Sequence, residues 1–203
     1  MKRTIAAGLI LLGLTGFWTG CGDTHSAGEG SGYTDMQEQE EPEEPEGIEA
    51  GMYKVGADIP AGEYVLVADD DGLEYWQIAK DSTGEFQSII RNDNYSNRSI
   101  ITLPEGTYFT FKDAVMYPAA EAPKPSFDKN IVPEGMYKVG TDFPAGEYKI
   151  IADEDSSGFY AVYKDSSQDI HAVKAIDNFS GQRYLTVSDG EYLKMQRCYL
   201  QLK

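Results

Sequence analysis

The chain has 203 residues, with 34 acidic against 17 basic side chains and a formal net charge of −17 at pH 7. Residues 50–203 alone hold 24 acids and 15 bases, a net charge of −9, without a cluster of lysine or arginine. This acidic body argues against nucleic acid as a partner, because the phosphate backbone requires a basic surface. It argues equally against a polybasic contact with a membrane.

Residues 1–20 have the layout of a secretory signal peptide, in which two basic residues precede an apolar stretch over 5–18. That stretch is shorter than the roughly 20 residues of a membrane-spanning helix. The following Thr19-Gly20-Cys21 resembles the lipobox of bacterial lipoproteins, although Trp18 stands where leucine is usual. The resemblance implies that Cys21 is acylated and anchors the protein to the extracytoplasmic face of the cell membrane. The alternative is a soluble secreted protein in which Cys21 is an incidental thiol.

Residues 21–49 are predicted to form a disordered acidic tether. They lack lysine and arginine and hold ten of the 34 acidic residues, together with glycine, serine and proline. Such a segment cannot bury enough apolar surface to offset its ordering entropy. If flexible, its r.m.s. reach is roughly 30 Å, and charge repulsion extends it further. We expect it to lift the folded part off the membrane.

An 84-residue duplication organises the rest of the chain. Residues 51–56 recur letter for letter at 135–140, and the alignment continues without a gap to the last residue. The predicted units are a first repeat over 50–118, a Pro-rich linker over 119–130 and a second repeat over 131–203. Because proline stiffens a linker, two beads joined by a short rod are expected, with packing of the copies against each other left open.

Periodicity within each copy is two, which predicts strands. Tyr64, Leu66 and Ala68 stay apolar in the second copy whereas Val65 becomes Lys149, so the first set is expected to face the core. Six short strands per copy predict an all-β fold of two tandem antiparallel sandwich- or barrel-like domains, Greek-key-like in connection. The expected strands are 52–56, 63–68, 74–80, 86–91, 99–103 and 107–116, with counterparts 84 residues later.

Each copy also repeats a shorter pattern, an apolar residue followed by x-x-Gly-x-Tyr. Glycine tolerates positive φ, so the chain is expected to turn there and leave as a strand. The pattern resembles the tyrosine corner of Greek-key proteins, in which the hydroxyl bonds to upstream backbone. The simpler explanation is that glycine starts strands and tyrosine favours them. The six tyrosines are Tyr53, Tyr64, Tyr108, Tyr137, Tyr148 and Tyr192.

The string Tyr-Lys-Val-Gly-x-Asp-x-Pro-Ala-Gly-Glu-Tyr occupies residues 53–64 and 137–148, and an Asp-Asn pair follows in each copy. It resembles repeats of surface lipoproteins and secreted proteins of Gram-positive bacteria. The resemblance covers both copies. It implies an extracytoplasmic all-β module, with no established activity attached.

Carboxylates gather at the same inter-strand loop in both copies. The residues are Asp69, Asp71 and Glu74 in the first copy and Asp153 and Asp155 in the second. Oxygen ligands of this kind suit Ca²⁺, although the spacing is not that of an EF-hand. A solvated acidic hairpin loop is the alternative to a calcium site, and no other cofactor is expected.

Four further residues are candidates for ligand binding. Tyr75 and Phe159 lie on the strand face opposite the predicted core, where a sugar could stack on them; core packing is the alternative. Asn94 and Asn178 fall in a turn-like segment that could display a binding tip, since loops on rigid β scaffolds often carry function.

Catalytic groups are scarce. A hydrolytic triad needs histidine beside a nucleophile, and His171, which aligns with Gln87, is expected to be an exposed strand residue. Cys198 aligns with Ala114 and is expected to be a buried, inert thiol on the final strand. Two scattered histidines and one spare cysteine give no zinc spacing. The sequence therefore predicts a protein that is not an enzyme.

Two functions follow from these features. The first is a lipid-anchored protein whose β-modules bind a cell-wall, glycan or protein partner, with avidity from the duplication. The alternative is a structural spacer or assembly subunit without a ligand of its own. A rigid interface between the copies would support that alternative.

Overall fold

The computed structural model describes residues 46–69 and 72–202, and this part of the chain is all β. The predicted leader, Cys21, most of the tether and Asp71 lie outside these residues. The first copy has strands β1 (Gly51–Lys54), β2 (Gly62–Ala68), β3 (Glu74–Ala79), β4 (Ile89–Tyr95), β5 (Arg98–Leu103), β6 (Tyr108–Phe111) and β7 (Ala114–Pro118). The second has β8 (Ile131–Val132), β9 (Gly135–Lys138), β10 (Gly146–Ala152), β11 (Gly158–Tyr163), β12 (Val173–Phe179), β13 (Gln182–Val187), β14 (Tyr192–Gln196) and β15 (Cys198–Gln201). Short 3-10 turns are η1 (Phe86–Ser88), η2 (Asp128–Asn130) and η3 (Ile170–Ala172).

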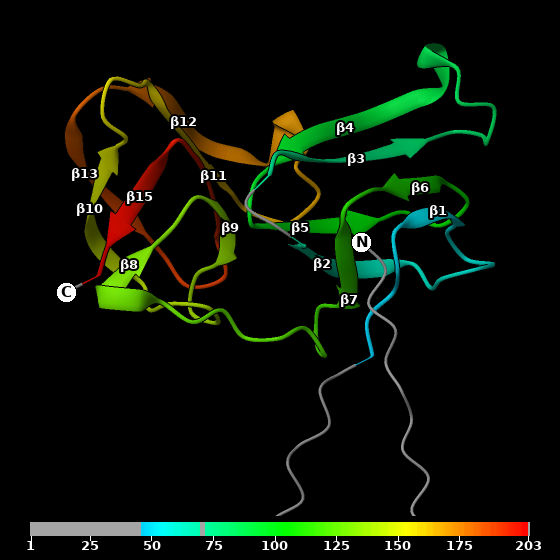
Figure 1. The fold of residues 1–203 in the computed structure, drawn as a ribbon, viewed down its shortest axis with the longest axis horizontal. Coiled ribbons are helices and arrows are strands. Elements are labelled where there is room, and N and C mark those ends of the chain that lie inside the picture. Colours follow the sequence, from blue (N-terminus) through cyan, green and yellow to red (C-terminus); the bar gives the residue numbers. More distant parts are fainter. Residues whose placement is uncertain (1–45, 70–71, 203) are drawn as a thin grey trace, which may run out of the picture. The chain divides into compact units, whose positions relative to one another are not determined.

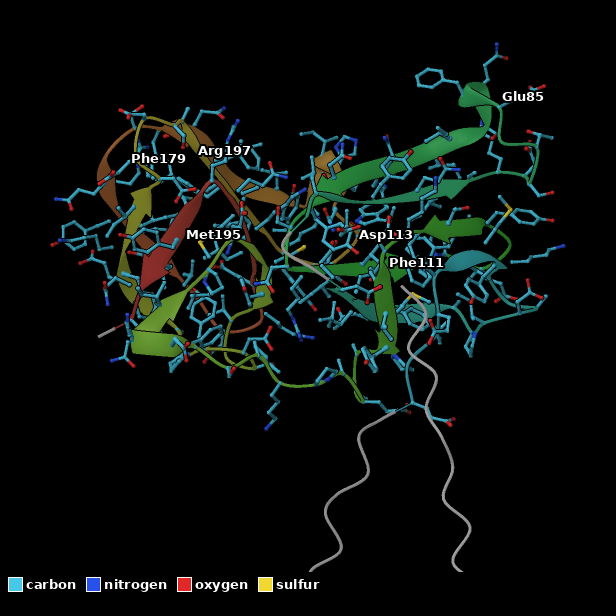
Figure 2. The ribbon with its side chains drawn as sticks, viewed as in Figure 1. Glu85, Phe111, Asp113, Phe179, Met195 and Arg197 are labelled. Carbon is cyan, nitrogen blue, oxygen red and sulfur yellow. The ribbon has the colours of Figure 1, made fainter. Side chains whose placement is uncertain are left out.

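Each copy is a sandwich of two antiparallel sheets (Figure 1). The first copy packs β1-β6-β3-β4 against β5-β2-β7, and the second packs β9-β14-β11-β12 against β13-β10-β15-β8. Strand registers are equal at the offset of 84: Gly51 faces Phe111, and Gly135 faces Met195. Figure 2 labels Phe111 and Met195, an equivalent pair. The duplication in sequence is thus a duplication of backbone pairing.

The predicted core positions lie between the two sheets of each copy. Leu66, Trp76 and Ile101 are buried in the first copy, as are Ile150 and Leu193 in the second. Along each strand the core residue alternates with one on the outer face, as a pleated strand requires. The expected all-β sandwich is therefore confirmed, and its outer faces are left for other contacts.

The tyrosine-corner interpretation is confirmed at four of the six positions. In these, the hydroxyl donates to a backbone carbonyl three or four residues upstream, which fixes the turn that precedes the strand. The bonds are Tyr53 to Glu49, Tyr64 to Pro60 and Tyr148 to Pro144, each 2.7 Å, and Tyr137 to Glu134, 3.3 Å. The hydroxyl of Tyr192 instead donates to Glu63 in the other copy.

Two predicted strands are wrong in their limits. Residues 86–88 form η1, and β4 begins only at Ile89 and continues through Asn94, which was expected in a turn. The single strand expected over 107–116 is two strands, β6 and β7, in different sheets. Asp113 separates them with φ of 50°, and Arg197 does so in the second copy with φ of 53°. These residues are labelled in Figure 2. A left-handed residue other than glycine or asparagine is hard to foresee from sequence.

The predicted boundaries also shift. Ile48, assigned to the tether, pairs with Met116 through two backbone hydrogen bonds of 2.7 and 2.9 Å. The linker is not a free rod, because Ala119 and Ala122 pack on a buried apolar cluster and Phe127 packs on the second core. Ile48 and the linker are therefore parts of the folded body.

The described residues of both copies belong to one compact unit. The copies are not two separate beads but pack against each other, the arrangement that the sequence left open, and the second copy covers the outer face of β5-β2-β7. Across 46–69 and 72–202, the structure contains no helix with the length and apolar character needed to cross a membrane.

Candidate functional site

The contact between the copies has an apolar centre. Val65 and Ile100, paired across β2 and β5, pack with Met136, Tyr163 and Tyr192 from the outer face of β9-β14-β11. Each of the five is at most 7% exposed. Val65 faces away from the first core, as its replacement by Lys149 in the second copy indicated, yet it is buried because the second copy covers it.

Glu63 is the polar centre of the same contact. Its carboxylate accepts from Ser166 Oγ at 2.6 Å, Tyr192 hydroxyl at 2.5 Å and Lys138 Nζ at 3.1 Å, all from the second copy. Burial by itself raises the pKa of Glu63, but these three donors outweigh it and hold the pKa below its ordinary value. Glu63 is therefore an ionised carboxylate that accepts from three donors of the second copy. Lys138 also lies over the Tyr192 ring, 5.1 Å from its centroid.

Backbone joins the copies as well. The N–H of Thr102 on the edge strand β5 donates to the carbonyl of Ser166 at 3.0 Å, and their hydroxyl oxygens are 2.7 Å apart. Gln168 Nε2 donates to the carbonyl of Ile100 at 2.9 Å. The loop 164–168 thus covers an edge that would otherwise expose unpaired groups.

A second ion pair is partly buried beside the cluster. Lys194 Nζ bonds Asp93 Oδ2, and the two side chains keep only 10% and 17% of their surface exposed. Burial raises the pKa of Asp93, and the positive charge of Lys194 opposes the shift. Nearby, Gln196 Nε2 donates to the carbonyl of Asn94 at 2.9 Å. Both interactions join β4 of the first copy to β14 of the second.

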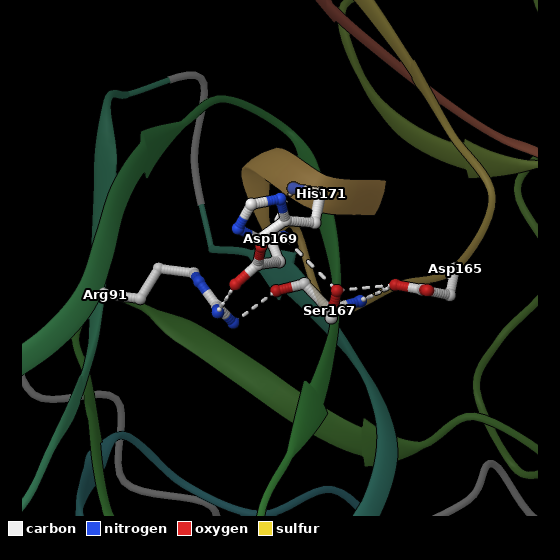
Figure 3. Close-up of polar contacts among 5 residues, drawn as sticks. All are labelled: Arg91, Asp165, Ser167, Asp169 and His171. Atoms are coloured by element: carbon white, nitrogen blue, oxygen red, sulfur yellow. Dashed lines mark hydrogen bonds and ion pairs between the residues drawn. The ribbon is translucent and has the colours of Figure 1, made fainter. Parts of the chain in front are cut away.

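A third set surrounds η3 (Figure 3). Arg91 donates to Asp169 Oδ2 at 2.8 Å and to the carbonyl of Ser167 at 2.5 Å. Asp169 is the N-cap of η3 and accepts the N–H of His171, which lowers its pKa, with further help from Arg91. Ser167 Oγ in turn donates to Asp165 at 2.5 Å. His171 is exposed as expected, but it lies in a 3-10 turn rather than a strand.

A cleft of about 480 Å³ opens between the copies beside the start of the linker. Its walls include Arg98, Glu63, Lys138 and Asp142, with Val65 and Ile100 as apolar floor. No aromatic ring is among its lining residues, so this cleft does not have the stacking platform expected of a sugar site.

Arg98 is the least satisfied group in the cleft. Its side chain is only 8% exposed, and its Nη1 donates to the carbonyl of Pro123 at 3.0 Å. Asp142 lies 3.8 Å from Nη2, and Nε has no hydrogen-bond partner within the described chain. Burial lowers the pKa of the guanidinium, although Asp142 opposes the shift. A buried donor without an acceptor is costly, and Nε itself has almost no accessible surface, so a ligand in the cleft can meet only the remaining accessible part of the Arg98 side chain.

The residues predicted to hold calcium are not brought together in the described part of the chain. There, no group of three or more histidine, cysteine or acidic side chains is placed to hold a metal ion. Asp69, Asp153 and Asp155 are exposed in loops, whereas Glu74 is buried at the start of β3. Asp71 lies outside the described residues, so calcium binding at its loop stays a prediction.

The aromatic candidates do not form a shared platform. Tyr75 is half-buried, and its hydroxyl donates to Gln77 at 3.0 Å. Phe159, its equivalent, packs against the inter-copy cluster and is used by the fold. Asn94 and Asn178 are exposed on strands and lie opposite Tyr75 and Phe159 in register.

Cys198 is a buried free thiol at the start of β15, as expected. Burial raises its pKa to about 11. Its Sγ lies 3.2 Å from the carbonyl of Phe159. The thiol is therefore a small core side chain rather than a nucleophile at neutral pH.

Sequence reasoning missed the residues that build the inter-copy site. Arg98 and Glu63 stand out only once the second copy is seen to cover β2 and β5. One signal was present: Val65 and Arg98 correspond to Lys149 and Gln182, so the two copies differ where one of them is covered. Glu63 gave no such signal, because Glu147 is identical to it.

Comparison with known proteins finds no matching family model, no matching curated protein and no matching solved structure.

Proposed function

We propose that the protein is an exported, lipid-anchored surface protein without catalytic activity, whose fused pair of β-modules binds a cell-wall or protein partner. The lipobox-like Cys21 and the acidic tether support the location. The binding site is the inter-copy cleft, and the ligand is a peptide segment whose carbonyl or carboxylate oxygen accepts from Arg98.

The single observation that carries this proposal is the cleft itself, whose lining includes Arg98 with an incompletely paired guanidinium. Arginine recognises planar oxygen acceptors well, because its guanidinium presents donors in a fixed fork. Asp142 and Thr141, which also line the cleft, can accept and donate to the peptide's polar groups, whereas Glu63 already accepts from three donors. A peptide therefore fits this cleft better than a sugar, which lacks an aromatic platform here.

The test is co-sedimentation of the full chain with purified peptidoglycan, before and after an amidase removes the stem peptides. We expect retention before treatment and at least a tenfold loss after it. Arg98→Gln converts the position to its second-copy equivalent and should lose retention, whereas Gln182→Ala should bind as the parent does.

A thermal melt of each variant separates loss of ligand from loss of fold. Equal retention of the parent and of a folded Arg98→Gln variant would sink the proposal. Retention by neither form of peptidoglycan would exclude a cell-wall peptide as the partner.

The extensive inter-copy contact favours a second candidate, a structural spacer or assembly subunit. Apolar packing, a backbone hydrogen bond and four ion pairs with one partner in each copy hold the copies in one arrangement. Such a body can transmit its geometry to an assembly without binding a small ligand.

A further inference from the structure

The apolar centre of the contact between the copies uses a different sheet from each. The first copy contributes the outer face of β5-β2-β7, with polar contacts from the edge strand β4 at the margin, and the second contributes the outer face of β9-β14-β11-β12. Because the copies have the same fold, each also carries the face that its neighbour uses. The second copy has an equivalent of the first face on β13-β10-β15, and the first copy has an equivalent of the second face on β1-β6-β3-β4. A contact of this head-to-tail kind can repeat from molecule to molecule.

The polar centre of the contact is present, residue for residue, on these two remaining faces. Glu63 and Thr102 of the first face correspond to Glu147 and Thr186, which are exposed and paired across β10 and β13. Lys138, Ser166 and Tyr192 of the second face correspond to Lys54, Ser82 and Tyr108.

The face of β1-β6-β3-β4, which carries the donors Lys54, Ser82 and Tyr108, already has the local arrangement of its buried equivalent in the second copy. Lys54 lies over the Tyr108 ring, 5.7 Å from its centroid, as Lys138 lies over Tyr192. In the loop that carries Ser82, Thr83 bonds Asp81 through its N–H at 3.1 Å and its hydroxyl at 2.5 Å. The loop that carries Ser166 has the same two distances. Little reorganisation is therefore needed to accept a carboxylate.

Large apolar side chains are exposed on the same faces. Met52 is 45% exposed where its equivalent Met136 is 1% exposed, and Tyr184 is 69% exposed where Ile100 is 2% exposed. These positions lie at the centre of the buried cluster within the chain.

Other contacts of the internal interface are missing. Val65 is replaced by Lys149, and Arg91, which bonds Asp169, is replaced by Ala175. The equivalent of Asp169 is Glu85, labelled in Figure 2 beside η1. The body also carries net negative charge, which repels its own copies. Contact between chains is therefore weaker than the internal one, which the linker supports by a high effective concentration.

We propose that separate chains associate head to tail, with the outer face of β13-β10-β15 of one chain seated on the outer face of β1-β6-β3-β4 of the next. Glu147 of one chain then accepts hydrogen bonds from Lys54, Ser82 and Tyr108 of the next chain, as Glu63 accepts from Lys138, Ser166 and Tyr192 within one chain. This association goes beyond the cleft proposed above and does not use Arg98.

Disulfide trapping in the full chain tests this arrangement. The double variant carries Thr186→Cys and Ser82→Cys. In the proposed contact, the new thiol at position 186 of one chain faces the new thiol at position 82 of the next, at positions equivalent to Thr102 and Ser166, whose hydroxyl oxygens are 2.7 Å apart within the chain. Mild oxidation of the double variant should give a ladder of dimers, trimers and longer products. A mixture of the two single variants should stop at dimers, and each single variant alone should remain at the level of the parent chain.

Three outcomes would overturn the proposal. The first is a double variant that stays monomeric at all concentrations on oxidation. The second is dimerisation of Thr186→Cys alone as full as that of the mixture, which means a symmetric contact. The third is failure of the internal control, Thr102→Cys with Ser166→Cys, to form its disulfide within the chain, because the proposed contact is built on that internal geometry.

Charge reversal supplies an independent readout. Glu147→Lys should lower the cross-linked fraction about tenfold, the change that corresponds to about 1.4 kcal/mol. Lys54→Glu should do the same, and the chain with both changes should recover the ladder. Glu154→Lys, the same charge change in an exposed loop, and Arg98→Gln should leave the ladder unchanged; a loss with either control as large as with Glu147→Lys contradicts the contact.

Discussion

Val65→Lys tests whether the inter-copy cluster stabilises the body. Val65 is 3% exposed, so removing its buried surface costs about 1.5 kcal/mol. A longer side chain in this packed site costs a further 1–3 kcal/mol or so. Its ammonium reaches the cleft, which Val65 lines, and the charge is therefore not trapped without water. We expect a total loss of about 2.5–4.5 kcal/mol in the free energy of unfolding.

The assay is urea unfolding of residues 46–203 followed by tryptophan fluorescence, since Trp76 lies in the first core. The matched control is Lys149→Val, the reverse exchange at the equivalent position, which should change stability by no more than about 0.5 kcal/mol. A loss below about 1 kcal/mol for Val65→Lys, or an equal loss for both variants, would refute the assignment of this cluster as a stabilising interface.

Two further predictions concern titrating groups. Because the folded pKa of Glu63 lies below its ordinary value, its contribution is present above an ordinary carboxyl pKa of about 4.3 and is lost as pH falls through the folded value. Glu63→Gln should therefore lower the free energy of unfolding by about 1–2 kcal/mol at pH 7, measured by urea unfolding, and the difference from the parent should shrink in acid. Glu147→Gln is the control and should change stability little. A difference from the parent that does not depend on pH contradicts the role given to Glu63. Cys198, with a pKa of about 11, should react with a thiol reagent at pH 8 about 200-fold more slowly in the folded chain than in urea. Cys198→Ala gives the background, and equal rates in both states would disprove its burial.

Much of the sandwich could be predicted from sequence because the two aligned copies show the same alternation of core and surface positions along their strands. Tyr64, Leu66 and their equivalents stay apolar at alternate positions, and that alternation alone determines which face is buried. The break between β6 and β7 could not be predicted, because Asp113 and Arg197 adopt a left-handed conformation that carries no residue signature. The η1 turn was not predicted either, because phenylalanine is typical of strands, whereas Phe86 is exposed in a 3-10 turn.

The candidate site was less predictable than the fold because it depends on tertiary contact. Arg98 looks like one more polar strand residue until the linker and the second copy enclose it. The exposed candidates were chosen for chemistry that each could perform alone. Residues that act only when two distant strands meet, such as Glu63 and Ser166, leave no local pattern to detect.

The identity of Glu63 and Glu147 is informative because only one of them has partners in the other copy. Within the described chain, Glu63 is held by three donors, whereas Glu147 lies exposed on β10. A scaffold role does not require an exposed glutamate after the strand-starting glycine, and core packing does not involve it. The same holds for Lys54, which is exposed where Lys138 is bonded to Glu63. A second use of both residues, in a contact between chains, accounts for acceptor and donor with one geometry.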